Sequence, residues 1–464
     1  MSQITRFDIE GLHGVTRVSV PIEDGRVILV GVNGLGKTTI VSMLYYFLTR
    51  QWRKLLEYEF DDISICLDGE TLSVTRELLS SPEVAWQQPL FESMPPAIAD
   101  RIFSSIDFRM LLRGIDALPL RREEILRVAR KLDVPISAVE RAYYYATRSH
   151  TLTSKKQRRT SKVLQDIEAR LATVGSRVLY LPTYRRIEQD LKSLFPELEG
   201  DFRKVVKSRV GKDSRAGFVE LVEFGMEDVD STVKTKVASL KDGSRVELNN
   251  LAGSYLRDVI RGEARHWDRE KITPLSDAEV KLILGRVEEK QLNERDKSKV
   301  FEVINRIRAS ERLDGDQDLL AHYFSKLVDI HESQQVAEVP LRQFIDVCNK
   351  YLQAKKFIFD DVKFELNLEL DSGFGIEMKD LSSGEKQIVS LFAHIYLGEG
   401  DKYILIIDEP ELSLSVEWQK TLLPDVIASG RCAFLAAVTH SPFIYENELF
   451  GSARDLAQLL RSKE

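Results

Sequence analysis

The feature that most constrains this sequence is a short loop between a strand pattern and a helix pattern. Residues 31–38 read GVNGLGKT, which matches the G-x-x-x-x-G-K-[ST] phosphate-binding loop. A β-rich run over Arg26–Val30 precedes the loop, and apolar residues at helical spacing follow from Thr39 to Arg50. Because glycines let backbone N–H groups curl around phosphates at a helix N-terminus, this placement predicts a nucleotide site.

The side chains of the loop have distinct expected roles. Lys37 is predicted to reach the β- and γ-phosphates of ATP, and Thr38 is predicted to bind Mg²⁺. The other predicted nucleotide contacts in this part of the sequence are Asn33, Gly34, Gly36 and Thr39.

An acidic motif follows an apolar run near the end of the sequence. Residues 403–407 read YILII, which is typical of a buried parallel strand, and Asp408-Glu409-Pro410 comes next. At the carboxyl end of such a strand, Asp408 is predicted to bind Mg²⁺ and Glu409 to polarise the attacking water. Taken alone, the same residues are equally compatible with a solvated acidic turn.

Two more segments are suited to binding an anion. Residues 381–387 read LSSGEKQ and precede a helical run, so Ser382, Ser383 and Gly384 are predicted to expose backbone N–H groups at a helix N-terminus. An ordinary serine N-cap is the alternative. His440 follows a strand-like run over Phe434–Val438, one strand after the acidic pair. This position favours a phosphate contact over the more frequent surface or core histidine.

The order of these four motifs resembles that of ABC-type ATPase heads, and more closely that of the chromosome-maintenance (SMC), RecF and OLD group. The resemblance implies an α/β head that hydrolyses ATP with Mg²⁺, in which the signature of one head completes the nucleotide site of another. Ser382 and Gly384 match the signature positions that touch the γ-phosphate. Asp408 and Glu409 match Walker B, and His440 matches the switch histidine.

The sequence departs from the family pattern in two places. Ser383 stands where the commonest signature has a second glycine. The glutamine loop is unassigned, since Gln87 and Gln88 lie near a proline-rich stretch without a clear strand before them. Tyr180–Arg186 follows a strand-like run and resembles a segment of soluble defence ATPases.

The resemblance covers about the first 95 and the last 110 residues and is weak between them. It implies a P-loop head that is split in sequence by two mainly helical insertions. We expect head lobe I over 1–95, a basic helical insertion over 96–176, a returning head segment over 177–224, a helical arm over 225–355 and head lobe II over 356–464. No segment sustains three or four heptads, so compact helical subdomains are expected rather than a long coiled coil.

The insertions contain three weaker patterns. Residues 121–146 resemble a helix-turn-helix, although an ordinary helical hairpin is the simpler interpretation. Arg141–Lys162 contains seven basic residues and no acidic one, which suits nucleic acid, an acidic protein or a solvated loop. Asp314–Asp318 opens like an EF-hand calcium loop, but the glycine and the bidentate glutamate of that loop are missing.

Composition excludes several classes of protein. The formal net charge of −7 excludes a uniformly basic nucleic-acid coat protein. No apolar run is long enough for a membrane-spanning helix, and the N-terminus lacks a signal-peptide pattern. The three cysteines form no CxxC pair, so neither a disulfide framework nor a zinc site is indicated. We therefore expect a cytoplasmic protein without a membrane partner.

The segment after His440 contains no Toprim-like or HNH-like nuclease pattern, unlike single-chain OLD enzymes. This combination resembles the ATPase subunits of two-gene anti-phage systems, AriA of PARIS first and PtuA of Septu second. The resemblance implies a homo-oligomer built through head-to-head dimers, a separate effector nuclease of the Toprim type and a phage-encoded trigger protein. The alternative is a RecF-like DNA-repair ATPase, whose candidate DNA contacts are Arg203, Lys204, Lys207, Arg209 and Lys212.

Overall fold

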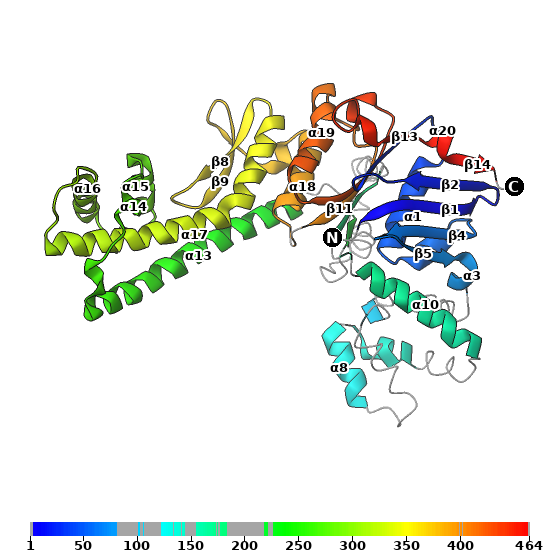
Figure 1. Ribbon diagram of the computed structural model, residues 1–464, viewed down its shortest axis with the longest axis horizontal. Helices are drawn as coiled ribbons and strands as arrows, with labels where there is room; N and C mark the ends of the chain where they lie inside the picture. Colours follow the sequence, from blue (N-terminus) through cyan, green and yellow to red (C-terminus); the bar gives the residue numbers. More distant parts are fainter. Residues whose placement is uncertain are drawn as a thin grey trace. The chain divides into compact units, whose positions relative to one another are not determined.

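The structure is a computed structural model that describes residues 3–80, 101–102, 105, 122–132, 134–140, 142–143, 155–172, 174, 177–182, 218–220, 226–398, 400 and 402–462. The chain divides into two compact units. The first unit combines Met1–Glu223 with Gly400–Glu464, and the second spans Phe224–Glu399. The first unit is therefore built from both ends of the sequence, drawn in blue and red in Figure 1.

A parallel sheet forms the centre of the first unit. Its strands follow the order β13-β3-β12-β11-β6-β7, and every neighbouring pair is parallel. Strand β11 is buried along its whole length, as expected for a parallel strand covered on both faces. The strands are β3 (Arg26–Val30), β6 (Arg177–Leu181), β7 (Phe218–Glu220), β11 (Tyr403–Asp408), β12 (Cys432–Thr439) and β13 (Ala453–Asp455).

An antiparallel sheet and helix α1 (Lys37–Leu48) complete the core of this unit. The order of the sheet is β14-β2-β1-β4-β5. Buried side chains of α1, including Ile40, Met43 and Phe47, join apolar residues of both sheets in one cluster. The strands of this sheet are β1 (Ile4–Leu12), β2 (Thr16–Pro21), β4 (Asp62–Leu67), β5 (Glu70–Thr75) and β14 (Leu460–Ser462).

The predicted α/β fold with a head split in sequence is confirmed, since β3 from the N-terminal part pairs with β12 from the C-terminal part. Helix α19 (Val416–Ala428) lies between β11 and β12 in sequence. Further helices of the unit are α2 (Trp52–Leu56), α3 (Arg76–Leu79), α8 (Arg122–Leu132), α10 (Lys155–Ala172), η4 (Pro442–Ile444), η5 (Phe450–Ser452) and α20 (Leu456–Leu459).

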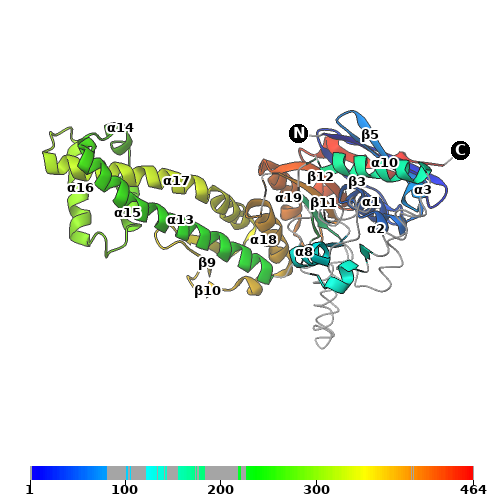
Figure 2. The ribbon, with the colours of Figure 1, turned by 90° about the horizontal axis from the view of Figure 1, so that it is seen from below.

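Two long helices dominate the second unit, and they lie side by side in Figures 1 and 2. Helix α13 (Met226–Arg261) has 36 residues and α17 (Gly315–Tyr351) has 37. Contacts from Ser244 to Gln334 and from Asp258 to His322 show that they run antiparallel. The expected helical arm over 225–355 therefore contains a long antiparallel helix pair in addition to short helices. The helices pair without a sustained heptad pattern. A buried polar contact joins Gln334 to Ser244, and part of the apolar surface of the two helices packs against the short helices instead.

The short helices pack against the C-terminal part of α13 and the N-terminal half of α17. They are η2 (Glu263–Arg265), α14 (Arg269–Ile272), α15 (Asp277–Gly285) and α16 (Glu294–Arg308). Asp314 caps α17 through a reciprocal capping box with Gln317, so the segment Asp314–Asp318 that opens like a calcium loop in sequence is the N-cap and first turn of this helix. In the described part of the chain, no group of three or more His, Cys, Asp or Glu side chains is placed to hold a metal ion.

A small antiparallel sheet follows α17. It has the order β10-β9-β8 and is formed by β8 (Lys355–Asp360), β9 (Glu365–Leu370) and β10 (Gly375–Ile376). Strands β8 and β9 form a hairpin with a turn at 361–364. The single turn η3 (Met378–Asp380) then leads into helix α18 (Ser383–Tyr396).

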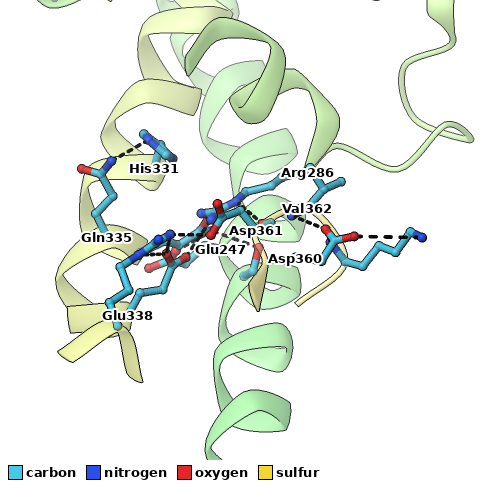
Figure 3. A network of polar contacts seen from close by, with 12 residues as sticks. Glu247, Arg286, His331, Gln335, Glu338, Asp360, Asp361 and Val362 are labelled. Atoms are coloured by element: carbon cyan, nitrogen blue, oxygen red, sulfur yellow. Dashed lines mark hydrogen bonds and ion pairs between the residues drawn. The ribbon is translucent and has the colours of Figure 1, made fainter. Parts of the chain in front are cut away.

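A buried polar network joins α17 to the β8–β9 turn (Figure 3). Arg286 donates to Glu338 Oε1 at 2.7 Å, to Gln334 Oε1 at 2.7 Å and to the Asp361 carbonyl at 2.9 Å. Glu338 is fully buried and also accepts a bond from Arg342 at 2.6 Å. Because buried charges persist only when they are paired and hydrogen-bonded, this network fixes the register of the elements it joins.

Several sequence predictions lie outside the described residues. These are Gln87, Gln88, residues 183–186, the basic group from Arg203 to Lys212 and most of the basic stretch before residue 155. Within the helix-turn-helix candidate, α8 and a short helix over 136–140 are described. Among the helices that the structure describes, none is both long and apolar enough to cross a bilayer.

Candidate nucleotide site

Three adjacent strands of the parallel sheet end at one edge. Val30 of β3 pairs with Thr439 of β12, and Val438 of β12 pairs with Asp408 of β11. Because the strands are parallel and in register, the chain segments that follow them leave the sheet at the same edge. The phosphate-binding loop, His440 and Glu409 are therefore brought together, with His440 directly after the middle strand. Open α/β sheets bind ligands at this edge.

The phosphate-binding loop has a backbone that requires glycine. The φ angles of Gly31, Gly34 and Gly36 are 149°, 87° and 82°, values that residues with a Cβ rarely adopt. Asn33, Gly34 and Thr38 are exposed and Thr39 is half-buried, whereas the helix that follows is mostly buried. The loop and the first turn of α1 are therefore open to an anionic ligand, while the rest of the helix holds them in place.

Lys37 closes this loop on itself. Its Nζ donates hydrogen bonds to the carbonyl oxygens of Gly31 at 2.8 Å and Val32 at 2.9 Å. Burial lowers the pKa of Lys37, and the carboxylates of Asp408, Glu409 and Glu411 partly oppose that shift. The ammonium group therefore lies within electrostatic reach of the residues that follow β11.

The acidic pair occupies the end of β11. Asp408 is fully buried and Glu409 is half-buried. Glu409 has a φ of 51°, a left-handed conformation that is uncommon for a residue with a side chain, and its N–H donates to the Val438 carbonyl at 2.8 Å. Backbone strain of this kind costs about 1–3 kcal/mol and persists where the surrounding structure enforces it, which is frequent at functional sites.

A third carboxylate, missed by the sequence prediction, contacts the end of β12. Glu411 Oε1 accepts from the N–H of His440 at 2.8 Å and of Ser441 at 3.2 Å, and Oε2 accepts from the Thr439 hydroxyl at 2.8 Å. The signal in the sequence is a third acidic residue, directly after Pro410, but its partner depends on which strand neighbours β11. His440 itself is exposed.

The signature-like residues belong to the second unit, whereas the residues above belong to the first. Ser382 is the N-cap of α18, and Ser382 and Ser383 are exposed while Gly384 is buried. Glu385 Oε2 accepts from the Ser382 N–H at 2.7 Å and from Lys355 Nζ at 2.8 Å. Burial pushes the pKa of Glu385 upward, but the bonds from Lys355 and Ser382 outweigh it and leave the pKa below its usual value.

The side chains at the edge of the sheet fit ATP with Mg²⁺. A threonine hydroxyl and a carboxylate, from Thr38 and Asp408, are the hard oxygen ligands that Mg²⁺ takes beside phosphate oxygens. Lys37 supplies a cation for the phosphates, and the open loop supplies backbone donors. The proposed roles of these residues follow from this chemistry and remain predictions.

The chain has limited similarity to known proteins. No curated protein matches the sequence. Among solved structures, an Smc head domain with an extended coiled coil bound to the C-terminal domain of ScpA, from Pyrococcus furiosus, is 12% identical, with 100% of this chain and 96% of that chain covered and a TM-score of 0.33. An Smc head domain with a coiled coil and joint from Pyrococcus yayanosii is 14% identical, with coverage of 100% and 97% and a TM-score of 0.32. TM-scores this low carry no argument about this chain.

A match to a sequence family is more informative. Residues 244–446 match the family described as "AAA domain, putative AbiEii toxin, Type IV TA system". The matched range contains the signature-like turn, the acidic residues after β11 and His440. Together with the phosphate-binding loop that precedes it, this match indicates that the chain is an ATPase with a region similar to AAA domains.

Proposed function

We propose that this chain is the ATPase subunit of a bacterial anti-phage defence complex and acts through ATP-dependent engagement of two copies. The observation that supports this best is the common edge at which the phosphate-binding loop, Glu409 and His440 leave three adjacent strands. A second observation is the exposed turn at Ser382 and Ser383 in the other unit. In the proposal, this turn completes the nucleotide site of a second copy.

The proposed reaction is phosphoryl transfer from ATP to water. Lys37 neutralises charge on the phosphates, and Glu409 orients the attacking water. Thr38 and Asp408 hold Mg²⁺, which neutralises charge on phosphate oxygens. His440 contacts the γ-phosphate from the middle strand. Binding of ATP closes the pair of heads, and hydrolysis opens it again.

A complementation experiment tests whether the site is shared between copies. Lys37→Ala removes the phosphate cation, and Ser382→Arg blocks the exposed turn, so each variant alone should be inactive. In a mixed dimer, the intact Lys37 of one chain meets the intact Ser382 of the other, and one of the two sites is whole. Mixing the variants should therefore restore ATP hydrolysis.

Ser298→Arg serves as the matched control, because Ser298 is an exposed serine of the second unit on α16. It should hydrolyse ATP like the unmodified chain. If mixing the two inactive variants restores no hydrolysis although both bind each other, each chain uses its own turn and the shared site is wrong. If Ser382→Arg alone hydrolyses ATP, the turn at Ser382 is not part of the nucleotide site.

The proposal also includes an effector protein and a trigger protein. ATP-dependent engagement holds a separate nuclease of the Toprim type, and a phage-encoded protein releases it. The description of the matching family names a toxin of a toxin–antitoxin system, which supports control of an effector. Affinity purification from the native host followed by mass spectrometry should recover a nuclease in fixed stoichiometry. Recovery of the chain alone, before and during infection, would contradict this role.

A RecF-like DNA-repair function is the alternative, and one observation favours it. Arg127, Arg130 and Lys131 are exposed on α8 beside the exposed Glu124, and Val128 and Ala129 are buried, so basic residues predominate on the described exposed side of this helix. Binding of duplex DNA with a steep dependence on salt concentration would support this function. Hydrolysis that is independent of DNA would favour the defence role.

A further inference from the structure

We infer that Glu411 is a positioning residue that holds His440 in place for ATP hydrolysis, an inference that rests on the proposed function. Its carboxylate accepts three hydrogen bonds, one from each of Thr439, His440 and Ser441. These are the last residue of β12 and the two residues that follow it. Glu411 itself comes three residues after the end of β11. One carboxylate thus ties together the ends of two neighbouring strands.

The need for this clamp follows from where the sheet ladder stops. The last ladder bond between the two strands runs from the N–H of Glu409 to the carbonyl of Val438. Beyond it, the N–H groups of His440 and Ser441 have no opposing strand and still require an acceptor. Glu411 supplies that acceptor for both, at 2.8 and 3.2 Å. A charged acceptor makes a stronger bond than a neutral one, so the backbone of His440 is held firmly.

The same turn places Glu409 and Glu411. Glu409 adopts the left-handed conformation, and the N–H of Leu412 donates to its carbonyl at 3.2 Å. The chain reverses there, which brings Glu411 back to the end of β12. The carboxylate proposed to orient water and the carboxylate that holds the histidine are therefore fixed by one short segment, and their spacing does not depend on mobile side chains elsewhere.

Other contacts keep the fold without Glu411. Ser441 Oγ donates to Gln419 Oε1 at 2.6 Å, and the Ser441 N–H lies 2.9 Å from the Thr439 hydroxyl. Thr439 is fully buried and pairs with Val30 in the sheet. Removal of the carboxylate should therefore loosen the backbone at His440 rather than unfold the unit. A shift of a catalytic contact by about 1 Å can lower a rate by about 100-fold.

Two substitutions separate position from charge. Glu411→Gln keeps an oxygen for the N–H groups of His440 and Ser441, and its amide can donate to the Thr439 hydroxyl, which is then free to donate to the Ser441 carbonyl 3.3 Å away. Glu411→Ala removes every bond. Since both substitutions remove the charge that acts on Lys37, an electrostatic role would affect them equally.

The experiment measures kcat, KM for ATP, ATP binding and thermal stability of the full chain. Glu411→Ala should lower kcat about 10- to 100-fold with KM within twofold and ATP binding retained, whereas Glu411→Gln should keep more than half of kcat. The double variant with His440→Ala should be no slower than His440→Ala alone, because both changes remove one function. Glu417→Ala, which removes an exposed carboxylate at the start of α19, is the control and should match the unmodified chain.

Four results would overturn the inference. Equal loss of kcat in Glu411→Ala and Glu411→Gln would assign the effect to charge. Additive losses with His440→Ala would separate the two residues. If Glu411→Ala has a normal kcat and His440→Ala is inactive, His440 does not need Glu411 to hold it. The proposed function would then stand, and only this inference would fail. If His440→Ala hydrolyses ATP normally, the role of His440 in the proposed function fails first, and this inference fails with it.

Discussion

Lys355 Nζ lies 2.8 Å from Glu385 Oε2, and the same oxygen accepts the backbone N–H of Ser382 at 2.7 Å. The first residue of β8 is thereby bonded to the turn that begins α18. Upstream, Asn349 near the end of α17 exchanges two bonds with the backbone of Phe357 in β8, at 3.0 and 2.7 Å. Within the second unit, strand β8 is thus bonded to the long helix at Phe357 and to the signature-like turn through Lys355.

Lys355→Ala should loosen the first turn of α18. Glu385 is buried and would lose its cationic partner, a loss of about 1–3 kcal/mol. Because its folded pKa lies below the ordinary 4.5, the contribution of the pair is present above that pH and is lost as the pH falls through the folded pKa. Amide hydrogen exchange over residues 382–390 at neutral pH should accelerate.

Lys363→Ala is the control for this change, since Lys363 is an exposed lysine of the adjacent hairpin turn. Its substitution should leave exchange in α18 unchanged. If amide exchange over residues 382–390 is equally slow in the two variants, the bond from Lys355 does not stabilise the turn.

Lys37→Ala should abolish ATP binding. The substitution removes the cation proposed to reach the phosphates and also the two bonds that close the loop on the carbonyls of Gly31 and Val32. We expect affinity to fall by at least about 100-fold, because charge-assisted bonds to phosphate are among the strongest in proteins. Titration calorimetry measures this directly. Lys54→Ala, on helix α2, controls for the loss of a positive charge, and undiminished affinity in Lys37→Ala would exclude the predicted phosphate contact.

Glu409→Gln should retain ATP binding and lose hydrolysis. The amide keeps the size of the side chain but cannot accept a proton, and general bases contribute about 10²–10⁴-fold to rates. ATP should therefore accumulate in a closed dimer, detectable by light scattering with and without nucleotide. Steady-state hydrolysis at the unmodified rate would show that Glu409 does not activate water.

The elements that form the candidate nucleotide site can be predicted from the sequence, whereas the residues and helices that hold them in place cannot. Strands β3, β11 and β12 and helix α1 are predictable within a few residues, because apolar runs and a glycine-rich motif are local signals. The role of Glu411 is not, since it depends on β12 being the neighbour of β11 and on the turn at Glu409. The length of α17 is hidden too, because the helix continues through Pro340, a residue that normally ends helices. The four boundaries between the five expected segments stay a prediction.

Glu338→Ala should strongly destabilise the second unit. The Arg286 side chain is 3% exposed and would keep its charge in the core without the carboxylate that it contacts at 2.7 Å. Removal of one member of a buried ion pair costs about 3–5 kcal/mol, and replacement of both by apolar residues costs much less. Urea unfolding of Glu338→Ala and of the pair Arg286→Met with Glu338→Leu tests this. Glu332→Ala, an exposed acidic residue of the same helix, is the control, and a loss no larger than in this control would contradict the prediction.

His331 should make stability depend on pH. The side chain is buried on α17, and its Nε2 lies 3.0 Å from Gln335 Nε2, while within the described residues its Nδ1 has no hydrogen-bond partner. Burial first, and then the nearby Arg286, lower the pKa of His331 from its ordinary 6.5. The unfolded chain therefore binds a proton at a higher pH than the folded chain does. Stability should fall as the pH drops below the unfolded pKa and stop falling below the folded pKa.

His331→Leu removes this titration together with a buried donor that lacks a partner. We expect its stability at neutral pH to stay within about 1 kcal/mol of the unmodified chain, since loss of an unsatisfied polar group offsets loss of the bond to Gln335. Between about pH 7.5 and 5.5, its urea midpoint should change less than that of the unmodified chain. His266→Gln, at an exposed position, is the control and should keep the full dependence. An equal pH dependence in His331→Leu would assign the acid sensitivity of the second unit to other groups.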